Sequence, residues 1–190
     1  MRKKPEKAHQ LLRFCTDAAK SVIREITRSG CGPFLSDPIA SETLISASTY
    51  REFVYPYSKE LMDYVKSLGM GMGYHICGKA VNILDDMVNT ACGTLSFDVQ
   101  VDVEDAKRLV GDRVPILGNI DVVQTLLMGT VDDVRQEVKS QLLKGYDSPK
   151  GFIVSVSCDM PVKTPLENID TIIETVREVG QYPYDPGLWE

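Results

Sequence analysis

The segment Met70-Gly71-Met72-Gly73-Tyr74-His75-Ile76 decides how the fold of this chain is interpreted. It is a short run of small and apolar residues, which is the pattern of a buried strand. Apolar residues at helical spacing precede it in Tyr50–Leu68, where Pro56 predicts a kink or a junction. A further helix is expected after it, near Asn82–Thr90. The segment is therefore the centre of a helix–strand–helix unit.

The same alternation of short apolar segments and helical patterns extends along the whole chain. The five expected strands are Pro33–Ser36, Met70–Ile76, Thr94–Phe97, Val114–Leu117 and Phe152–Val156. The other expected helices are Leu11–Ile26, a segment starting near Val103, a stretch that ends before Gly129, Val131–Leu143 and Leu166–Val179. Short apolar strands that alternate with helices predict a parallel α/β sheet whose strands are buried on both faces.

Two architectures satisfy the rules for parallel strands joined by helices: an open doubly wound sheet and a part of a (βα)8 barrel. Five units in 190 residues amount to about 38 residues per unit, so that eight units would need about 300 residues. A length of about 300 residues is typical of a (βα)8 barrel with insertions, and it is greater than the length of this chain. We expect a single α/β domain over residues 1–190, and the barrel alternative implies a partial (βα)8 TIM barrel of about five βα units.

Composition and charge exclude several classes of function. With 21 basic and 27 acidic residues the chain has a formal net charge of −6, which is unsuited to binding a nucleic-acid backbone. No stretch approaches the ~20 apolar residues of a membrane span, and residues 1–7 lead into an amphipathic helix rather than a signal peptide. We therefore expect a cytoplasmic protein with no nucleic-acid or membrane partner. The five scattered cysteines argue for free thiols rather than a disulfide framework.

Three residues with soft ligand atoms are expected at the ends of strands. His75, one of only two histidines, lies two residues before Cys77, and residues i and i+2 of a strand point to the same side. Cys158 follows the last expected strand, and parallel α/β folds bring the carboxyl ends of distant strands to one face. Three such ligands with one open position are the pattern of a catalytic zinc site. The alternative is that all three are ordinary core residues.

Polar residues follow other expected strands as well. Asp98 and Asp121 are the candidate catalytic residues, because each carboxylate could orient His75 or bind substrate from the end of a strand. Helix capping is the alternative role for both. Asp37 and Asn119 are the candidate substrate-binding residues, and for Asp37 the alternative is a solvent-exposed loop position.

Several stretches together resemble the uroporphyrinogen decarboxylase superfamily, and within it the corrinoid-dependent methyltransferase branch that includes the methylcobalamin:coenzyme M methyltransferases. They are His75-Ile76-Cys77-Gly78, Gly118-Asn119-Ile120-Asp121, and residues 157–169 with the sequence SCDMPVKTPLENI, preceded by Asp37-Pro38 and the segment from Ser46 to Tyr57. The resemblance covers nearly the whole chain, which corresponds to the C-terminal part of the family's pattern.

The resemblance implies a (βα)8 barrel in which His75, Cys77 and Cys158 hold a zinc ion that activates a thiol. It also implies that the methyl group comes from a methyl-corrinoid carried by a partner corrinoid protein, and that a small thiol accepts it. The decarboxylases proper lack this metal and use an N-terminal segment, bearing arginine and aspartate, that does not occur in this sequence.

The leading hypothesis is therefore zinc-dependent methyl transfer from a methyl-corrinoid protein to a thiol. One alternative is a metal-free tetrapyrrole enzyme of the decarboxylase type, and another is a non-catalytic module that binds a corrinoid or its carrier. Five strands leave two open sheet edges and one uncovered face, so the isolated chain is expected to be inactive. It is also expected to need an N-terminal half or to self-associate.

Overall fold

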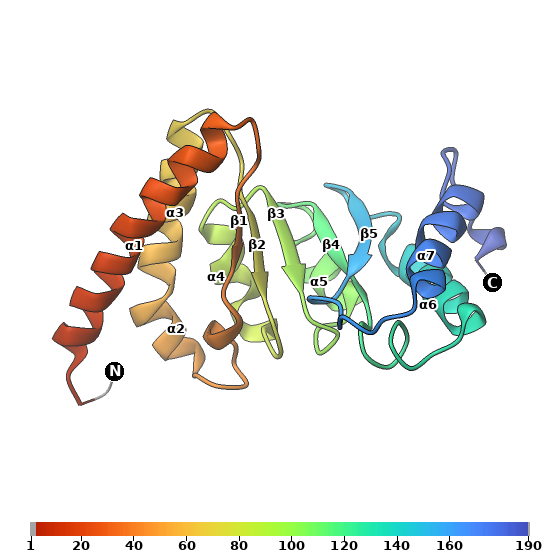
Figure 1. Ribbon diagram of the computed structural model, residues 1–190, viewed down its shortest axis with the longest axis horizontal. Helices are drawn as coiled ribbons and strands as arrows, with labels where there is room; N and C mark the ends of the chain where they lie inside the picture. The colour runs from red at the N-terminus through yellow and green to blue at the C-terminus, as the bar shows by residue number, and fades with distance from the viewer. Residues whose placement is uncertain (1–2, 190) are drawn as a thin grey trace.

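The five segments expected as strands form one parallel sheet in the computed structural model, which describes residues 3–189 (Figure 1). The strands are β1 Phe34–Ser36, β2 Gly73–Ile76, β3 Thr94–Phe97, β4 Ile116–Ile120 and β5 Phe152–Val156. Each strand pairs in parallel with its neighbour in the chain, in the order 1-2-3-4-5. A doubly wound sheet would reverse its strand order, so the structure confirms the partial-barrel alternative.

Helices precede, connect and follow the strands, and they contact one another in succession. They are α1 Pro5–Arg28, α2 Ala47–Phe53, α3 Tyr55–Ser67, α4 Leu84–Asn89, α5 Val103–Val110, α6 Val131–Gly145 and α7 Leu166–Val179, with three short 3-10 helices at Pro38–Ala40, Val81–Ile83 and Pro186–Leu188. Contacts run from α1 to α3, then through α4, α5 and α6 to α7. The helix expected over Tyr50–Leu68 divides at Val54, and Pro56 lies in the first turn of α3. The predicted junction is therefore confirmed, at a position where proline costs no hydrogen bond.

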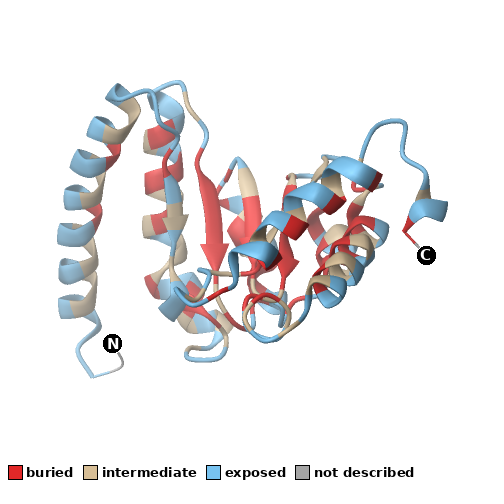
Figure 2. Cartoon of the chain, turned by 45° about the vertical axis from the view of Figure 1, so that its right-hand side comes forward, coloured by how far each residue is buried: buried red, intermediate tan, exposed pale blue. Residues whose placement is uncertain are grey.

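The hydrophobic core lies between the sheet and these helices. All four residues of β2 are buried, and Figure 2 shows buried residues concentrated along the strands and on the helix surfaces that face them. The expectation that every strand is buried on both faces is wrong at the two edges. Phe34 of β1 and Ile153 of β5 are 53% and 51% exposed, and both belong to edge strands of the sheet.

Two further expectations about element boundaries are corrected. Residues 118–120, which lie beyond the expected strand Val114–Leu117, belong to β4 and pair with β5, with Ile120 opposite Val156. The stretch before Gly129, expected as a helix, forms turns in which Leu126 N–H and Met128 N–H bond to carbonyls five residues earlier. An α-helix requires four-residue spacing, so these bonds close wider loops.

Within residues 3–189, no helix combines the length and the apolar character that a membrane crossing would require.

Candidate metal centre

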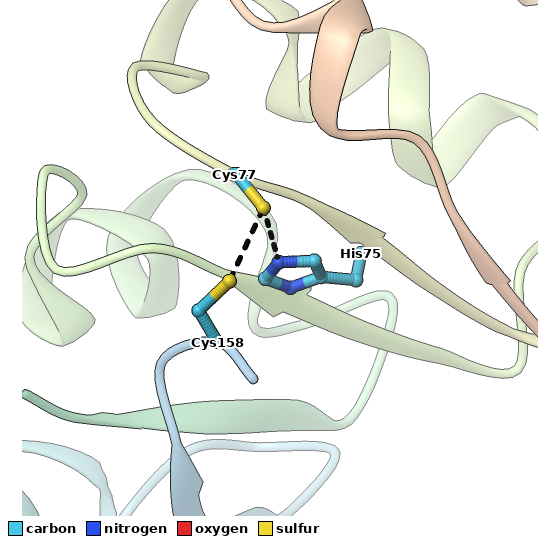
Figure 3. A group of neighbouring side chains, drawn as sticks. All are labelled: His75, Cys77 and Cys158. Atoms are coloured by element: carbon cyan, nitrogen blue, oxygen red, sulfur yellow. Dashed lines mark hydrogen bonds between the residues drawn. The ribbon is translucent and has the colours of Figure 1, made fainter. Parts of the chain in front are cut away.

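The side chains of His75, Cys77 and Cys158 converge at the carboxyl end of the sheet (Figure 3). His75 belongs to β2, Cys77 follows the end of that strand, and Cys158 lies two residues beyond β5. His75 Nε2 is 3.2 Å from Cys77 Sγ, and Cys77 Sγ is 3.3 Å from Cys158 Sγ. In a flat sheet, β2 and β5 would lie about 14 Å apart across the two strands between them. The contact therefore depends on the curling of the sheet toward a barrel.

The donor set and spacing of these three residues suit zinc. One imidazole nitrogen and two thiol sulfurs are ligands that zinc prefers, and the candidate ligand atoms all lie within 4.8 Å of one another. Bonds of about 2.3 Å to sulfur and about 2.0 Å to nitrogen place tetrahedral ligand atoms roughly 3.5–3.8 Å apart. The measured separations of 3.2 and 3.3 Å are a few tenths of an ångström shorter, which small side-chain rotations can correct.

Burial determines the protonation of these ligands in the metal-free chain. It lowers the pKa of His75 below its ordinary value of 6.5, against the charges of Asp98 and Asp159, which raise it. Burial also raises the pKa of the Cys77 thiol to about 12, with smaller contributions from Cys158 and from the same two carboxylates. The cluster without metal therefore holds a neutral imidazole and a protonated Cys77 thiol.

A cavity of about 240 Å³ lies beside the cluster, and every strand of the sheet contributes to its lining. Its walls are formed by Phe34, Ser36, His75, Ser96, Leu117, Ser155, Val156, Cys158 and Asp159. Because the lining comes from the strands and the loop after β5, the cavity lies on the inner face of the sheet. A ligand in this cavity would contact His75 and Cys158 directly.

Asp98 is the candidate catalytic residue that the structure brings near the cluster. It follows β3, and its charge raises the pKa values of both His75 and Cys77. Its Oδ1 accepts a hydrogen bond from Gln100 N at 3.3 Å, within its own loop. The catalytic role of Asp98 stays a prediction.

Asp121 and Asn119 lie together in a different cavity, between β4 and α6. Asp121 Oδ1 accepts hydrogen bonds from the N–H groups of Val123 and Gln124, both at 2.8 Å. Asn119 Nδ2 donates to the carbonyl oxygens of Asp98 at 3.2 Å and Val101 at 2.8 Å. These hydrogen bonds stabilise loops at the end of the sheet. Those of Asp121 to backbone N–H groups resemble the capping role that was its alternative. The structure does not bring either side chain to the metal cluster, and their predicted roles stay predictions.

The side chain of Asp37 also lies apart from the cluster, although its backbone N–H donates a hydrogen bond to the carbonyl oxygen of His75 at 3.0 Å. It lines a mainly apolar cavity of about 200 Å³ formed by α1, α3 and the residues around Val54. Burial there raises the pKa of its carboxyl group, against a backbone hydrogen bond from Ala40 that lowers it. The structure therefore offers no contact between Asp37 and the cavity beside His75, and substrate binding by Asp37 stays a prediction.

Sequence reasoning missed two residues at the site. Ser96 hydrogen-bonds to His75, with 3.0 Å between Oγ and Nδ1, and Asp159 lines the cavity. The available signal for Ser96 was a polar residue between the apolar Leu95 and Phe97 of an expected strand, and the structure buries it to 6% exposure. The signal for Asp159 was its position directly after Cys158.

Comparison with known proteins identifies relatives of two kinds. The family model described as uroporphyrinogen decarboxylase (URO-D) matches residues 1–179. A methylated-thiol–coenzyme M methyltransferase of Methanosarcina mazei is 33% identical over 182 residues, and the methylcobamide:CoM methyltransferase MtbA of Methanosarcina acetivorans is 32% identical over 168. These alignments cover 95% and 88% of this chain. A uroporphyrinogen decarboxylase of Pelodictyon phaeoclathratiforme is 27% identical over 183 residues, 94% of this chain.

A solved structure also matches the fold. A methyltransferase from Methanosarcina mazei superposes with a TM-score of 0.81 at 27% sequence identity, over 90% of this chain and 49% of that one. The alignments to the three sequence relatives cover 47%, 48% and 51% of those proteins. The chain therefore spans about half the length of the relatives it matches.

Proposed function

Because the chain belongs to the uroporphyrinogen decarboxylase (URO-D) family, we propose that it forms the zinc-binding part of a methyltransferase that acts on a thiol. The observation that carries this proposal is the convergence of His75, Cys77 and Cys158 beside a cavity. The higher identity to coenzyme M methyltransferases, 33% against 27% for a decarboxylase, supports the same branch.

Each of the three side chains would supply one ligand atom to such a site. His75 is a neutral nitrogen donor, Cys77 and Cys158 are thiolate donors once their protons leave, and a fourth position remains for the acceptor. Zinc in this site would favour the thiolate form of the acceptor. That thiolate would form a bond to the methyl carbon while the bond from this carbon to the corrinoid cobalt breaks, and the corrinoid would leave with the electron pair on its cobalt. We assign Asp98 the role of receiving the thiol proton, since it follows β3 at the carboxyl end of the sheet and its charge raises the pKa values of both His75 and Cys77.

The cavity suits the acceptor rather than the methyl donor. Typical ligand pockets enclose about 300–1,000 Å³, and this cavity of about 240 Å³ has room for a small thiol beside His75 and Cys158. A corrinoid macrocycle is much larger, so the methyl donor approaches from the open side of the sheet on a partner corrinoid protein. The relatives described as methylcobamide:CoM methyltransferases support a corrinoid as the donor.

The proposal also assigns a role to the missing strands. Five strands with free edges at β1 and β5 enclose only part of a barrel, and the chain matches about half of each relative. An N-terminal half that supplies the remaining strands would close the cavity on its open side. We therefore propose that the isolated chain does not turn over, and that it needs this half or a second copy.

Zinc content across the five cysteine variants tests this function. Cys77→Ser and Cys158→Ser should each abolish stoichiometric zinc, because a serine hydroxyl is a harder and much less acidic ligand than a thiol. Cys15→Ser, Cys31→Ser and Cys92→Ser should retain it, since the first two are exposed and the third is buried away from the cluster. Elemental analysis measures zinc per chain, and circular dichroism verifies folding.

Two results would overturn the proposed function. One is a wild-type chain that stays free of zinc after reconstitution under reducing conditions. The other is retention of zinc by both Cys77→Ser and Cys158→Ser. Either result would favour the metal-free, decarboxylase-like alternative. A loss of stability alone would instead affect buried Cys92 as well, by about 1–3 kcal/mol for a buried hydroxyl.

A further inference from the structure

Ser96 contacts His75 through a hydrogen bond that the sheet itself fixes. His75 in β2 and Ser96 in β3 are register partners, and both side chains are 6% exposed. The distance from His75 Nδ1 to Ser96 Oγ is 3.0 Å. Because the two residues face each other across paired strands, the orientation of the ring does not depend on a mobile loop.

The other ring nitrogen faces the sulfur atoms. His75 Nε2 is 3.2 Å from Cys77 Sγ, which makes Nε2 the nitrogen on the metal side of the ring. A metal ligand must offer a free lone pair, so a neutral ring that binds through Nε2 carries its hydrogen on Nδ1. Ser96 Oγ is the atom in position to accept that hydrogen bond.

We propose that Ser96 is a positioning residue that holds His75 in the Nδ1–H tautomer and aims the Nε2 lone pair at Cys77 and Cys158. The expected effect of Ser96 on zinc affinity rests on the proposed function. The tautomer of His75 can be tested in the metal-free chain. Partners that orient metal-binding histidines in this way typically contribute a factor of 10–100 to metal affinity.

Nuclear magnetic resonance of the metal-free chain tests the tautomer directly. The chain has two histidines, so a His9→Gln background leaves His75 as the sole source of imidazole signals. Long-range ¹H–¹⁵N correlations should show hydrogen on Nδ1 in the chain that retains Ser96. In Ser96→Ala the population should shift toward the Nε2–H form, because the acceptor for Nδ1–H is gone. An unchanged Nδ1–H population in Ser96→Ala would overturn the proposal.

Zinc affinity provides the second readout, measured by competition with a chelator at one pH. Ser96→Ala should weaken zinc binding roughly 10–100-fold, and Ser96→Thr, which keeps the hydroxyl, should restore most of it. Ser155→Ala is the matched control, because Ser155 lines the same cavity from β5, and it should bind zinc as the wild type does. Equal affinity of Ser96→Ala and wild type would contradict the proposal.

The two measurements separate this proposal from the proposed function. If the wild-type chain binds no zinc, the proposed function fails, while the tautomer measurement still decides the role of Ser96. If zinc binds and the tautomer does not respond to Ser96→Ala, the proposed function stands and the role of Ser96 is refuted.

Discussion

The sulfur atoms of Cys77 and Cys158 lie 3.3 Å apart although the two residues are 81 positions apart in the sequence. Two simple rules predicted that His75, Cys77 and Cys158 lie at the same end of the sheet: side chains at i and i+2 share one side of a strand, and parallel strands end at one face. The contact between the two sulfur atoms also requires the sheet to curl, which these rules do not predict. The hydrogen bond between Ser96 and His75 was not predictable, because it depends on which residue of β3 pairs with His75. Strand register depends on packing of the whole sheet, and the sequence of one short strand does not reveal it.

Zinc affinity should increase with pH, because the ligands must lose protons to bind. Burial raises the pKa of Cys77 to about 12, so its thiol is protonated throughout the neutral range and zinc must displace that proton. We therefore expect the logarithm of the apparent affinity to fall by at least about one unit for each pH unit of acidification from pH 8 to pH 7. Competition with a chelator of known proton affinity measures it. An affinity independent of pH would count against thiolate ligands.

At the scale of elements, α1 is joined to α3 by a small ion-pair network. Glu60 of α3 accepts hydrogen bonds from Arg13 and Lys20 of α1, with 2.7 Å from Arg13 Nη1 to Glu60 Oε1. These two cations hold the pKa of Glu60 at about 2, below its ordinary value of 4.5. The apolar face of α1 predicted a packed helix, but the sequence did not reveal which acidic residue its cations would meet, because 40 positions or more separate the partners.

Glu60→Gln should lower the free energy of unfolding by about 1 kcal/mol at pH 7, a modest value because the Glu60 side chain is 33% exposed. The folded pKa lies below the unfolded one, so this contribution is present above about pH 4.5 and is lost as the pH falls toward 2. Urea unfolding at pH 7, 4.5 and 3 should show the difference between wild type and variant shrinking with acidity. Glu52→Gln, at an exposed position of α2, should show no such trend.

The packing of α6 on β5 depends on a glycine. A Cβ at Gly145 would lie 2.4 to 2.6 Å from ring atoms of Phe152, closer than van der Waals contact permits. We therefore expect Gly145→Ala to destabilise the fold by about 1–3 kcal/mol, despite the gain of up to about 1 kcal/mol that alanine provides in a helix. Chemical denaturation measures the change.

Two further variants separate the steric effect from helix propensity. Ser140→Ala, at an exposed position of the same helix, should be neutral or slightly stabilising. Gly145→Ala should cost less in a Phe152→Leu background, where the ring is absent. A loss of stability that is the same in both backgrounds would contradict the proposed clash.

At the scale of the whole molecule, the strand order 1-2-3-4-5 brings the metal ligands together and leaves two sheet edges unpaired. The curling of the sheet brings β2 and β5 together at the carboxyl end, and because five strands do not close a barrel, β1 and β5 keep free edges. The alternation of strands and helices predicted the βα units and their parallel sheet. It did not distinguish a barrel from a doubly wound sheet, because strand order results from how the helices pack, and segment lengths do not encode it.

The free edges predict self-association of the isolated chain. Unpaired backbone groups along β1 and β5, together with the half-exposed side chains of Phe34 and Ile153, form a surface that proteins normally cover. Sedimentation velocity over a range of concentrations should show dimers or larger species. A lysine on an edge strand blocks such pairing, so Ile153→Lys should shift the distribution toward monomer.

Leu109→Lys on α5 is the matched control, because Leu109 is 40% exposed and belongs to a helix that contacts β4 rather than either edge strand. It adds the same charge and should leave self-association unchanged, whereas a general effect of charge on solubility would make the two variants alike. The same preparations should lack methyl transfer from methylcobalamin to a small thiol, since the cavity is open where a barrel would continue. A monodisperse wild-type monomer with full turnover would show that five strands suffice, and the requirement for a second half or a second copy would then be wrong.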